Sequence, residues 1–255
     1  MKIATWNVNS LRVRLPQVLQ WLETAQPDVL ALQETKLSDD KFPVEEIAAA
    51  GYQVAFHGQP TYNGVAILSR LPLTDVRIGM PGFDDDQARV LAATVDGVRV
   101  LDLYVPNGQE VGSEKYAYKL RWLEHLAGVV AAELAQHSRL VVLGDFNIAP
   151  ADADVHDPEA WRGKVLFSEP EKVALQRLFD LGLADSFRLF DQDENVFSWW
   201  DYRAAGFRRN IGLRIDLVLL SETLAANCTD ASVDRAPRAW ERPSDHAPAL
   251  ASFKL

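Results

Sequence analysis

The sequence predicts an α/β sandwich, in which two β-sheets pack face to face and helices cover the outside. Short buried apolar runs alternate with longer segments of helical periodicity, and β-rich stretches lie between them. The chain has 255 residues, enough for one large α/β domain or two small ones. Trp6-Asn7-Val8-Asn9 and Asp145-Phe146-Asn147 both end a strand with two polar residues spaced by one, which indicates two related halves.

The first half of the chain predicts strands alternating with two helices. Pro16 suits the first turn of the first helix, and Gly51 ends a short second helix that begins at Val44. Asp96-Gly97 is the two-residue turn of a hairpin. The acidic run Asp84-Asp85-Asp86 could bind a cation, but a solvated loop is the favoured interpretation. The predicted strands cover residues 3–8, 29–32, 52–56, 64–68, 90–95 and 98–103.

The second half predicts a long helix over 116–134, whose apolar residues form a core face. Ser168-Glu169-Pro170-Glu171 is a capping box that begins another helix. Its buried stripe is expected to contain Ala174, Leu178 and Leu181. The predicted strands cover residues 140–143, 214–220 and 247–253.

The composition is that of an ordinary globular protein, with 48% hydrophobic and 24% charged residues. The single cysteine, Cys228, excludes an internal disulfide framework and is expected in the core. We expect a cytoplasmic protein, since neither a signal peptide nor a membrane-spanning run is recognisable. The net charge of −10 argues against a protein that coats DNA non-specifically, although binding depends on where the charges lie.

Polar side chains follow the predicted strands at their carboxyl ends, where α/β sheets place their chemistry. After a single strand, such as the one before Asp145 and Asn147, an Asx-turn is the simpler interpretation. Convergence of several strand ends would instead create a site rich in oxygen ligands, which suits Mg²⁺ or Mn²⁺ better than zinc. The residues concerned are Asn7, Asn9, Glu34, Tyr104, Asn107, Asp145, Asn147, Asp216, Asp245 and His246.

Among the five histidines, His246 has the strongest functional context, because Asp245 precedes it and a strand follows it. Asp216 is the carboxylate expected to fix its tautomer and stabilise its cation. A serine hydrolase is excluded, since there is no G-x-S-x-G and Ser244 lies too close to His246. The chain also contains neither a P-loop nor G-x-G-x-x-G.

The segment 197–214 combines aromatic residues with four Arg against one Asp, a local charge of +3. Arginines interleaved with aromatic rings are typical of a groove for a phosphate backbone and unstacked bases. The alternative is a Trp-rich edge of the core with solvated arginines. The contrast with the acidic remainder of the chain favours binding.

Seven motifs in order along nearly the whole chain resemble the exonuclease III family of apurinic/apyrimidinic (AP) endonucleases. They are Trp6-Asn7-Val8-Asn9, Leu32-Gln33-Glu34-Thr35-Lys36, Tyr62-Asn63-Gly64-Val65-Ala66, Tyr104-Val105-Pro106-Asn107-Gly108, Gly144-Asp145-Phe146-Asn147, Leu213-Arg214-Ile215-Asp216 and Ser244-Asp245-His246. The resemblance implies a single catalytic domain over 1–255, built as a four-layer α/β sandwich of the endonuclease/exonuclease/phosphatase group.

The resemblance also implies roles for the individual residues. Glu34 is the principal metal ligand with Asn7 beside it, and Asp145, held by Asn147, orients or deprotonates the attacking water. His246, paired with Asp216, stabilises the phosphorane. The remaining residues implied at the site are Tyr104 and Asn107 at the scissile phosphate, Asp245 near the metal, Trp199, Leu213 and Ile215 as walls of a sugar pocket, and Asn9, Tyr62, Arg208, Arg209 and Arg214 as DNA contacts.

The implied activity is Mg²⁺-dependent cleavage of duplex DNA 5′ to abasic sites, removal of nucleotides or blocking groups from 3′ ends, or both. The partner is then duplex DNA with abasic sites or damaged 3′ ends, and the protein is expected to act as a monomer without a membrane partner. Two alternatives are a phosphatase of the same group acting on a phospholipid or inositol phosphate, and a catalytically dead phosphate-binding module. The arginine-aromatic segment argues against the first, and the intact set from Asn7 to His246 argues against the second.

Overall fold

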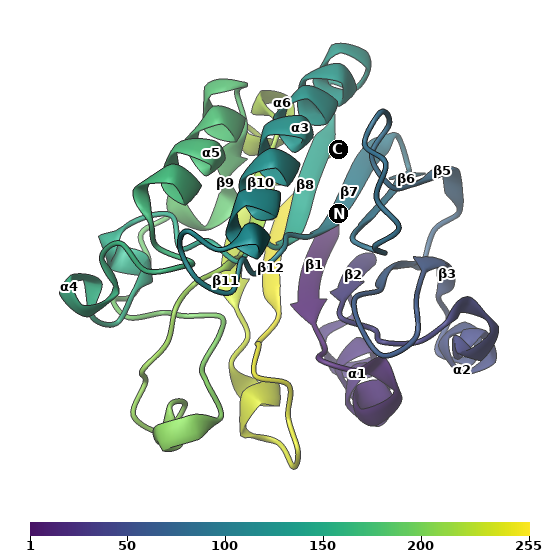
Figure 1. The fold of residues 1–255 in the computed structure, drawn as a ribbon. Helices are drawn as coiled ribbons and strands as arrows, with labels where there is room; N and C mark the ends of the chain where they lie inside the picture. Colours follow the sequence, from purple (N-terminus) through teal and green to yellow (C-terminus); the bar gives the residue numbers. More distant parts are fainter.

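The computed structural model describes residues 1–255 as four layers, with two β-sheets in the middle and helices outside them (Figure 1). The first sheet has the strand order β11-β12-β1-β2-β4-β3. Its strands are β1 (Lys2–Asn7), β2 (Val29–Gln33), β3 (Gln53–His57), β4 (Val65–Ser69), β11 (Cys228–Val233) and β12 (Ala249–Phe253). The helices of this half are α1 (Leu11–Ala25) and α2 (Val44–Ala49).

The second sheet has the order β5-β6-β7-β8-β10-β9. Its strands are β5 (Leu73–Ile78), β6 (Val90–Val95), β7 (Val98–Tyr104), β8 (Leu140–Asp145), β9 (Ala184–Asp185) and β10 (Asp216–Leu220). The remaining helices are α3 (Glu114–Gln136), α4 (Pro158–Trp161), α5 (Glu169–Asp180) and α6 (Glu222–Ala225). No helix is long and apolar enough to cross a membrane.

Three apolar clusters hold the four layers together. The central cluster lies between the sheets and joins β-branched residues such as Val29 and Val141. On the outer face of the first sheet, Trp21 of α1 and Ile47 of α2 pack against Leu30. The third cluster packs α3 and α5 against the outer face of the second sheet. The sandwich predicted from alternating strands and helices is therefore confirmed.

The two sheets share one pairing pattern, as the echo between the two strand ends predicts. In the first sheet, β1 and β2 run parallel, and each pairs antiparallel with an outer neighbour, β12 or β4. In the second, β7 and β8 run parallel, with β6 and β10 as antiparallel neighbours. Parallel neighbours end at the same edge of a sheet, so Asn7 lies beside Gln33, and Tyr104 lies beside Asp145.

Some predicted details were wrong. Pro16 lies well inside α1, which begins at Leu11 and not near the proline. Leu181 follows α5 and is 38% exposed, because the helix has ended before it can face the core. Cys228 begins the edge strand β11 and is only partly buried. Asp84 to Asp86 form a loop as expected, in which Asp85 accepts hydrogen bonds from the Tyr118 hydroxyl and the Gln87 backbone N–H.

Candidate active site

The central group of the site consists of Glu34, Asp145 and His246, which come from three different strand ends. One ligand atom from each residue lies within 4.8 Å of the others. Asp145 ends β8, Glu34 directly follows β2, and His246 precedes β12, so the two-sheet topology brings them together. Asp145 and His246 are buried, whereas Glu34 remains partly open to solvent.

The amide of Asn7 connects the two carboxylates of this group. Its Nδ2 donates to Glu34 Oε1 at 2.9 Å and to Asp145 Oδ2 at 2.9 Å, and its Oδ1 accepts from the backbone N–H of Asn9. With the oxygen engaged by that amide, Asn7 lies between the carboxylates as a hydrogen-bond donor. Lys36 Nζ lies 2.9 Å from Glu34 Oε2 and balances part of the negative charge.

His246 lies between the carboxylates of Asp216 and Asp145, and the sequence predicts its pairing with Asp216. Its Nδ1 is 2.9 Å from Asp216 Oδ2, and its Nε2 is 3.8 Å from Asp145 Oδ2. Burial opposes the charged imidazole, but the attraction of Asp216 and Asp145 outweighs it and raises the pKa of His246 to about 10. Burial also raises the pKa of Asp145 to about 7, against the opposing effect of the imidazolium. The ring is therefore a cation that faces the cavity at neutral pH.

Asn147 fixes the orientation of Asp145 through a tight turn after β8. The Asn147 backbone N–H donates to Asp145 Oδ1 at 2.9 Å, and its side-chain amide donates to the Val105 carbonyl at 2.9 Å. The turn needs a left-handed residue, and Asn147 has φ 48°, which asparagine tolerates better than most residues. The Asx-turn and the functional interpretation are thus compatible at this strand end.

Tyr104 ends β7, and Asn107 lies in the loop that follows it. Burial, followed by the nearby Glu34 and Asp145 carboxylates, raises the pKa of Tyr104 well above its usual value. Tyr104 therefore remains a hydroxyl donor at neutral pH. Asn107 is exposed and its Nδ2 donates to Asn147 Oδ1 at 3.2 Å.

Asp245 lies in a second polar cluster, beside the central group and not within it. Its two oxygens accept from Asn9 Nδ2 at 2.9 Å and from Trp199 Nε1 at 3.0 Å. Burial opposes ionisation of Asp245, but His246 and these donors lower its pKa. Asn9 Oδ1 in turn accepts from Lys36 Nζ at 2.6 Å. Both carboxylate oxygens thus accept a hydrogen bond, and the place of Asp245 near the metal or a second cation site stays a prediction.

Three other expectations for the DNA-binding residues need correction. Arg214 is 1% exposed and pairs with Asp154 at 2.7 Å and with Asp185 at 2.6 Å, so it stabilises the fold and cannot reach a DNA backbone. Leu213 and Ile215 are 0% and 1% exposed and belong to a closed apolar cluster, so they do not line an open sugar pocket. The three corrections have one cause, because residues distant in the sequence cover these side chains.

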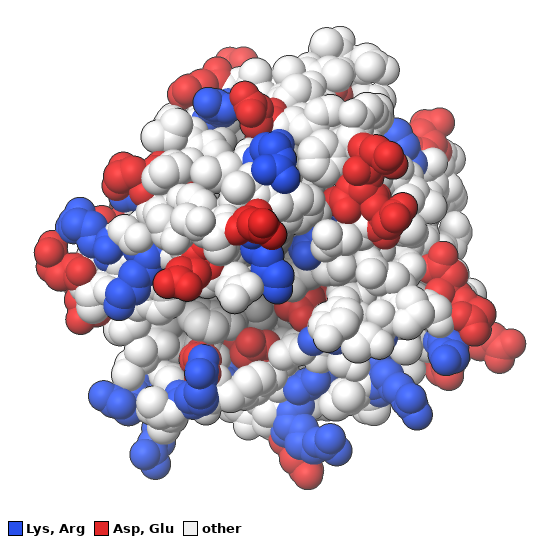
Figure 2. Space-filling view, in the orientation of Figure 1, with Lys and Arg blue, Asp and Glu red and all other residues white.

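The other predicted DNA contacts lie on the surface. Arg208, Arg209 and Tyr62 are exposed, and Trp199 is partly exposed. Figure 2 shows Lys and Arg gathering along the lower edge of this face, around a hollow in which acidic side chains are visible. The helix α1, the segment 197–214 and the loop before β12 lie in the lower part of the molecule in this orientation (Figure 1). Their exposed arginines are Arg12, Arg203, Arg208, Arg209, Arg235 and Arg242.

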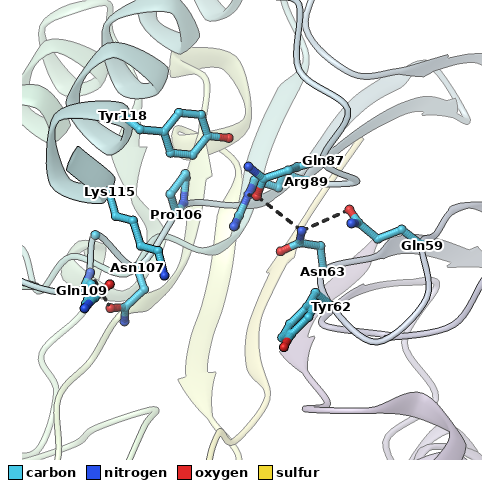
Figure 3. A pocket seen from close by; sticks show the side chains of 11 residues that line it. Gln59, Tyr62, Asn63, Gln87, Arg89, Pro106, Asn107, Gln109, Lys115 and Tyr118 are labelled. Carbon is cyan, nitrogen blue, oxygen red and sulfur yellow. Dashed lines mark hydrogen bonds between the residues drawn. The ribbon is translucent and has the colours of Figure 1, made fainter. Parts of the chain in front are cut away.

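A polar pocket of about 700 Å³ adjoins the site on the side of Asn107 (Figure 3). Arg89 contributes a guanidinium that lies 4.7 Å from the ring centre of Tyr104. Tyr62 projects from the loop between β3 and β4, and Lys115 from the start of α3. The amide side chains that line the pocket are Gln59, Asn63, Gln87, Asn107 and Gln109.

Sequence reasoning missed Ser198, which holds the carboxylate behind His246. Its hydroxyl donates to Asp216 Oδ2 at 2.6 Å and accepts from the backbone N–H groups of Ile215 and Asp216. The sequence feature that could have identified Ser198 was its position directly before Trp199, within the segment predicted to bind. Ser244, excluded above as a nucleophile, is buried and donates to the Asn7 carbonyl at 2.7 Å.

The donor set can hold a metal ion. Two carboxylates approach one another in a mostly buried position, and Glu34 leaves the group accessible from the cavity. Oxygen ligands of this kind suit a hard divalent cation, and a protonated His246 would not serve as a ligand. Glu34 and Asp145 are the residues that fit it best.

Two packed mixed sheets with an acidic group and a charged Asp–His pair at their shared edge define a hydrolase of phosphate esters. The model of the "Endonuclease/Exonuclease/phosphatase family" matches residues 4–246. The chain is 38% identical to exodeoxyribonuclease III of Haemophilus influenzae, over 100% of both chains. We conclude that the chain belongs to the exonuclease III family of AP endonucleases within that superfamily, as its motifs predict.

Solved structures agree with this assignment. The 3′-5′ exonuclease NExo from Neisseria meningitidis is 51% identical and superposes with a TM-score of 0.98, with 100% of each chain covered. A variant of the Neisseria 3′ phosphatase NExo, bound to a product DNA hairpin, has the same identity, coverage and TM-score. An AP endonuclease from Archaeoglobus fulgidus is 39% identical, with a TM-score of 0.96 and 100% of each chain covered.

Proposed function

We propose that the protein is a Mg²⁺-dependent DNA-repair phosphoesterase that removes nucleotides or blocking phosphates from 3′ ends of duplex DNA. The observation that carries the proposal is the group of Glu34, Asp145 and a charged His246 at the junction of the two sheets. Full-length similarity to a Neisseria enzyme described as a 3′ phosphatase and a 3′-5′ exonuclease supports the choice of substrate.

Asp145 is the residue placed to accept a proton from the attacking water. General-base catalysis works best when the pKa of the base lies near the working pH, and burial raises the pKa of Asp145 to about 7. Asn7 and Asn147 hold its two oxygens in fixed positions. A bound Mg²⁺, or Mn²⁺ in its place, would supply Lewis-acid polarisation of the phosphate and partial neutralisation of its charge.

The developing charge on the phosphate would meet fixed donors from His246, which belongs to the central group, and from Tyr104 near it. His246 remains cationic because Asp216 lies behind it, and the hydroxyl of Tyr104 remains protonated. Preorganised donors of this kind stabilise a transition state without reorganising during the reaction. Asn107 lines the polar pocket and donates to Asn147, so it would orient the phosphate at the border between the site and that pocket.

Duplex DNA would lie across the face shown in Figure 2, where exposed cations surround the acidic hollow. Phosphate contacts depend on local positive charge, so a net charge of −10 does not prevent binding. Arg208, Arg209 and Tyr62 are the proposed contacts. The enzyme would act as a monomer in the cytoplasm, with the single Cys228 suited to a reducing compartment.

Incision at abasic sites is the second candidate, which the similarity to the Archaeoglobus AP endonuclease favours. An extruded sugar needs an opening beside Trp199, however, and Leu213 and Ile215 are closed off in the apolar cluster behind it. The phospholipid alternative lacks support, because cations and amides line the neighbouring pocket.

The test compares one duplex with a 3′-phosphate and a second duplex with a stable abasic analogue, each with Mg²⁺ and with a chelator. We expect Mg²⁺-dependent release of phosphate from the first duplex, faster than cleavage of the second. Asp145→Asn is the control that should remove both activities. The proposal would be contradicted if the wild-type protein acted on neither duplex with Mg²⁺ or with Mn²⁺.

A further inference from the structure

A buried lysine lies beneath the two loops that carry Asn107 and Asn147. Lys119 belongs to α3 and its side chain is 0% exposed. Its Nζ donates to the Asn147 carbonyl at 2.7 Å and to the Asn107 carbonyl at 3.1 Å. The third contact is the carboxylate of Glu171. An ammonium group has three donors, so all of them are used within this connection.

Glu171 neutralises the lysine and connects it to α5. Its carboxylate is also 0% exposed, and it accepts from the backbone N–H groups of Leu166 and Ser168, each at 3.0 Å. The pair is therefore fully satisfied, which a buried ion pair requires if it is not to destabilise the fold. One cation thus joins α3, α5 and both loops of the site.

The loop after β7 packs directly on the aliphatic part of Lys119. Gly108 has φ +91°, and a Cβ at this position would lie 3.0 Å from Lys119 Cδ and 3.3 Å from Val165 Cγ2. On the other loop, Asn147 has the left-handed φ of 48°, and Lys119 binds the carbonyl of that same residue. The lysine therefore contacts each loop where its backbone is most constrained.

We propose that Lys119 is a positioning residue for the reaction, because it holds the loops of Asn107 and Asn147 at a fixed separation. The inference rests on the proposed function. Asn107 Nδ2 lies 3.2 Å from Asn147 Oδ1, and Asn147 holds Asp145 through its backbone N–H. Loss of the cation would allow both loops to shift, and would misdirect Asp145 and Asn107 without removing either side chain.

The experiment compares two double variants that each remove a buried ion pair involving α3. Lys119→Met with Glu171→Gln removes the pair beneath the site. Arg99→Met with Glu133→Gln removes a pair at the opposite end of α3, where Arg99 Nε lies 2.9 Å from Glu133 Oε2. The readouts are kcat and KM for release of phosphate from a 3′-phosphate duplex, and the melting temperature of each variant.

We expect kcat of the first double variant to fall by roughly 30-fold or more, because small displacements of positioned groups cost about 100-fold in rate. KM should change less than about threefold, since an effect confined to the transition state leaves ground-state binding unchanged. The Arg99 and Glu133 variant should lose stability but keep its kcat. Equal losses of kcat in the two variants, or unchanged kcat in the first, would overturn the proposal.

Gly108→Ala provides a second test that leaves both charges in place. The added methyl group would displace the Asn107 loop from Lys119, so kcat should fall again while the melting temperature changes less than in the double variant. If the Lys119 and Glu171 double variant does not fold, the kcat of Gly108→Ala becomes the test of the proposal. A kcat of Gly108→Ala equal to that of the wild type then overturns the proposal. Failure of the wild-type enzyme to act on DNA would instead count against the proposed function.

Discussion

At the residue scale, two carboxylates and one cationic ring lie together in the buried part of the site. Asp145 and Asp216 carry negative charge on either side of the His246 ring, and Glu34 adds a further carboxylate at the open side. The asymmetry arises from what each carboxylate contacts. Asp216 Oδ2 lies 2.9 Å from Nδ1 of the ring and accepts from the Ser198 hydroxyl, whereas Asp145 Oδ2 lies 3.8 Å from Nε2 and close to Glu34. Asp216 is therefore suited to hold the histidine, and Asp145 is suited to react.

Glu34→Gln tests whether Glu34 belongs to the metal site. The substitution removes a ligand charge but keeps the shape, so activity should fall about 100-fold or more, in the range found when one transition-state contact is lost. High Mg²⁺ should restore part of it, and the melting temperature should change little because Glu34 is partly exposed. The measurement is a Mg²⁺ titration of both proteins, and an identical Mg²⁺ dependence would rule out this role for Glu34.

His246→Ala and Asp216→Ala test whether the pair acts as one unit. Nδ1 of the ring lies 2.9 Å from the carboxylate, so each single variant should lose the same transition-state contact, at a cost of several kcal/mol, on the order of 3–4. The double variant should be hardly worse than either single one, because residues that act together are not additive. A double-mutant cycle in kcat/KM measures this, and additive losses would show that the two side chains work separately.

At the scale of the elements, strands with an apolar run were predictable, and three strands without one were not. The apolar runs of β2, β4, β7 and β8 are buried throughout, and their predicted bounds agree with the structure within a few residues. The short β9 and the edge strands β5 and β11 expose alternating or polar residues and contain no apolar run. Such strands depend on a neighbour for their pairing, which a local pattern does not contain.

In the site as well, local motifs predicted some features, whereas contacts between residues far apart in the sequence determine others. The strand-end motifs predicted that Glu34, Asp145 and His246 converge, and their ligand atoms do lie together. The carboxyl ends of the parallel pairs and the start of the antiparallel β12 lie at one edge of the two packed sheets. The motif around Leu213 to Asp216 did not reveal that Arg214 is buried. Its partners Asp154 and Asp185 are far away in the sequence, so only the folded chain shows the ion pairs.

The segment 197–214 leads to a prediction that separates binding from folding. Arg208 and Arg209 are exposed, so replacing both with Ala should weaken DNA binding and reduce the salt slope by roughly one or two units of log Kd per log of salt. Arg214→Ala should instead destabilise the protein by about 3–5 kcal/mol, because Asp154 and Asp185 lose their buried partner.

Binding across a salt series and urea unfolding of both variants would check this assignment. Lys254→Ala, at an exposed cation after the end of β12 that points away from the site, is a matched control for loss of a surface cation. A salt slope that is unchanged in the Arg208 and Arg209 variant, or an Arg214 variant of normal stability, would contradict it.

At the scale of the whole molecule, a fully buried carboxylate lies between the two sheets. Asp102 of β7 is 0% exposed, and only its Oδ1 has a side-chain partner, Gln33 Nε2 at 2.7 Å. Its Oδ2 has no hydrogen-bond partner. Burial raises the pKa of Asp102 well above its usual value, despite the hydrogen bond from Gln33. Gln33 belongs to β2 in the other sheet, so this contact connects the two halves of the sandwich.

The sign of the resulting pH dependence follows from the raised pKa. Between the pKa of the unfolded chain and the higher pKa of the folded protein, the folded state binds more protons, so stability decreases as pH rises. Asp102→Asn has the same shape without a charge to bury, and should remove this contribution. We expect it to raise the melting temperature at pH 8 by roughly 2–4 °C, corresponding to about 1 kcal/mol in a chain of this size.

At pH 5 the gain should be smaller, because the carboxyl group of the wild-type protein is then neutral in the fold. Thermal unfolding of both proteins from pH 5 to pH 8 measures the difference, and Asp230→Asn on the edge strand β11, where the carboxylate is exposed, serves as the control. An Asp102→Asn variant that is less stable than wild type at pH 8 would mean that hydrogen bonds between the sheets compensate for burial of the charged carboxylate. The hydrogen bond from Gln33 would then be made to a charged carboxylate, and not to the neutral carboxyl group that its burial indicates.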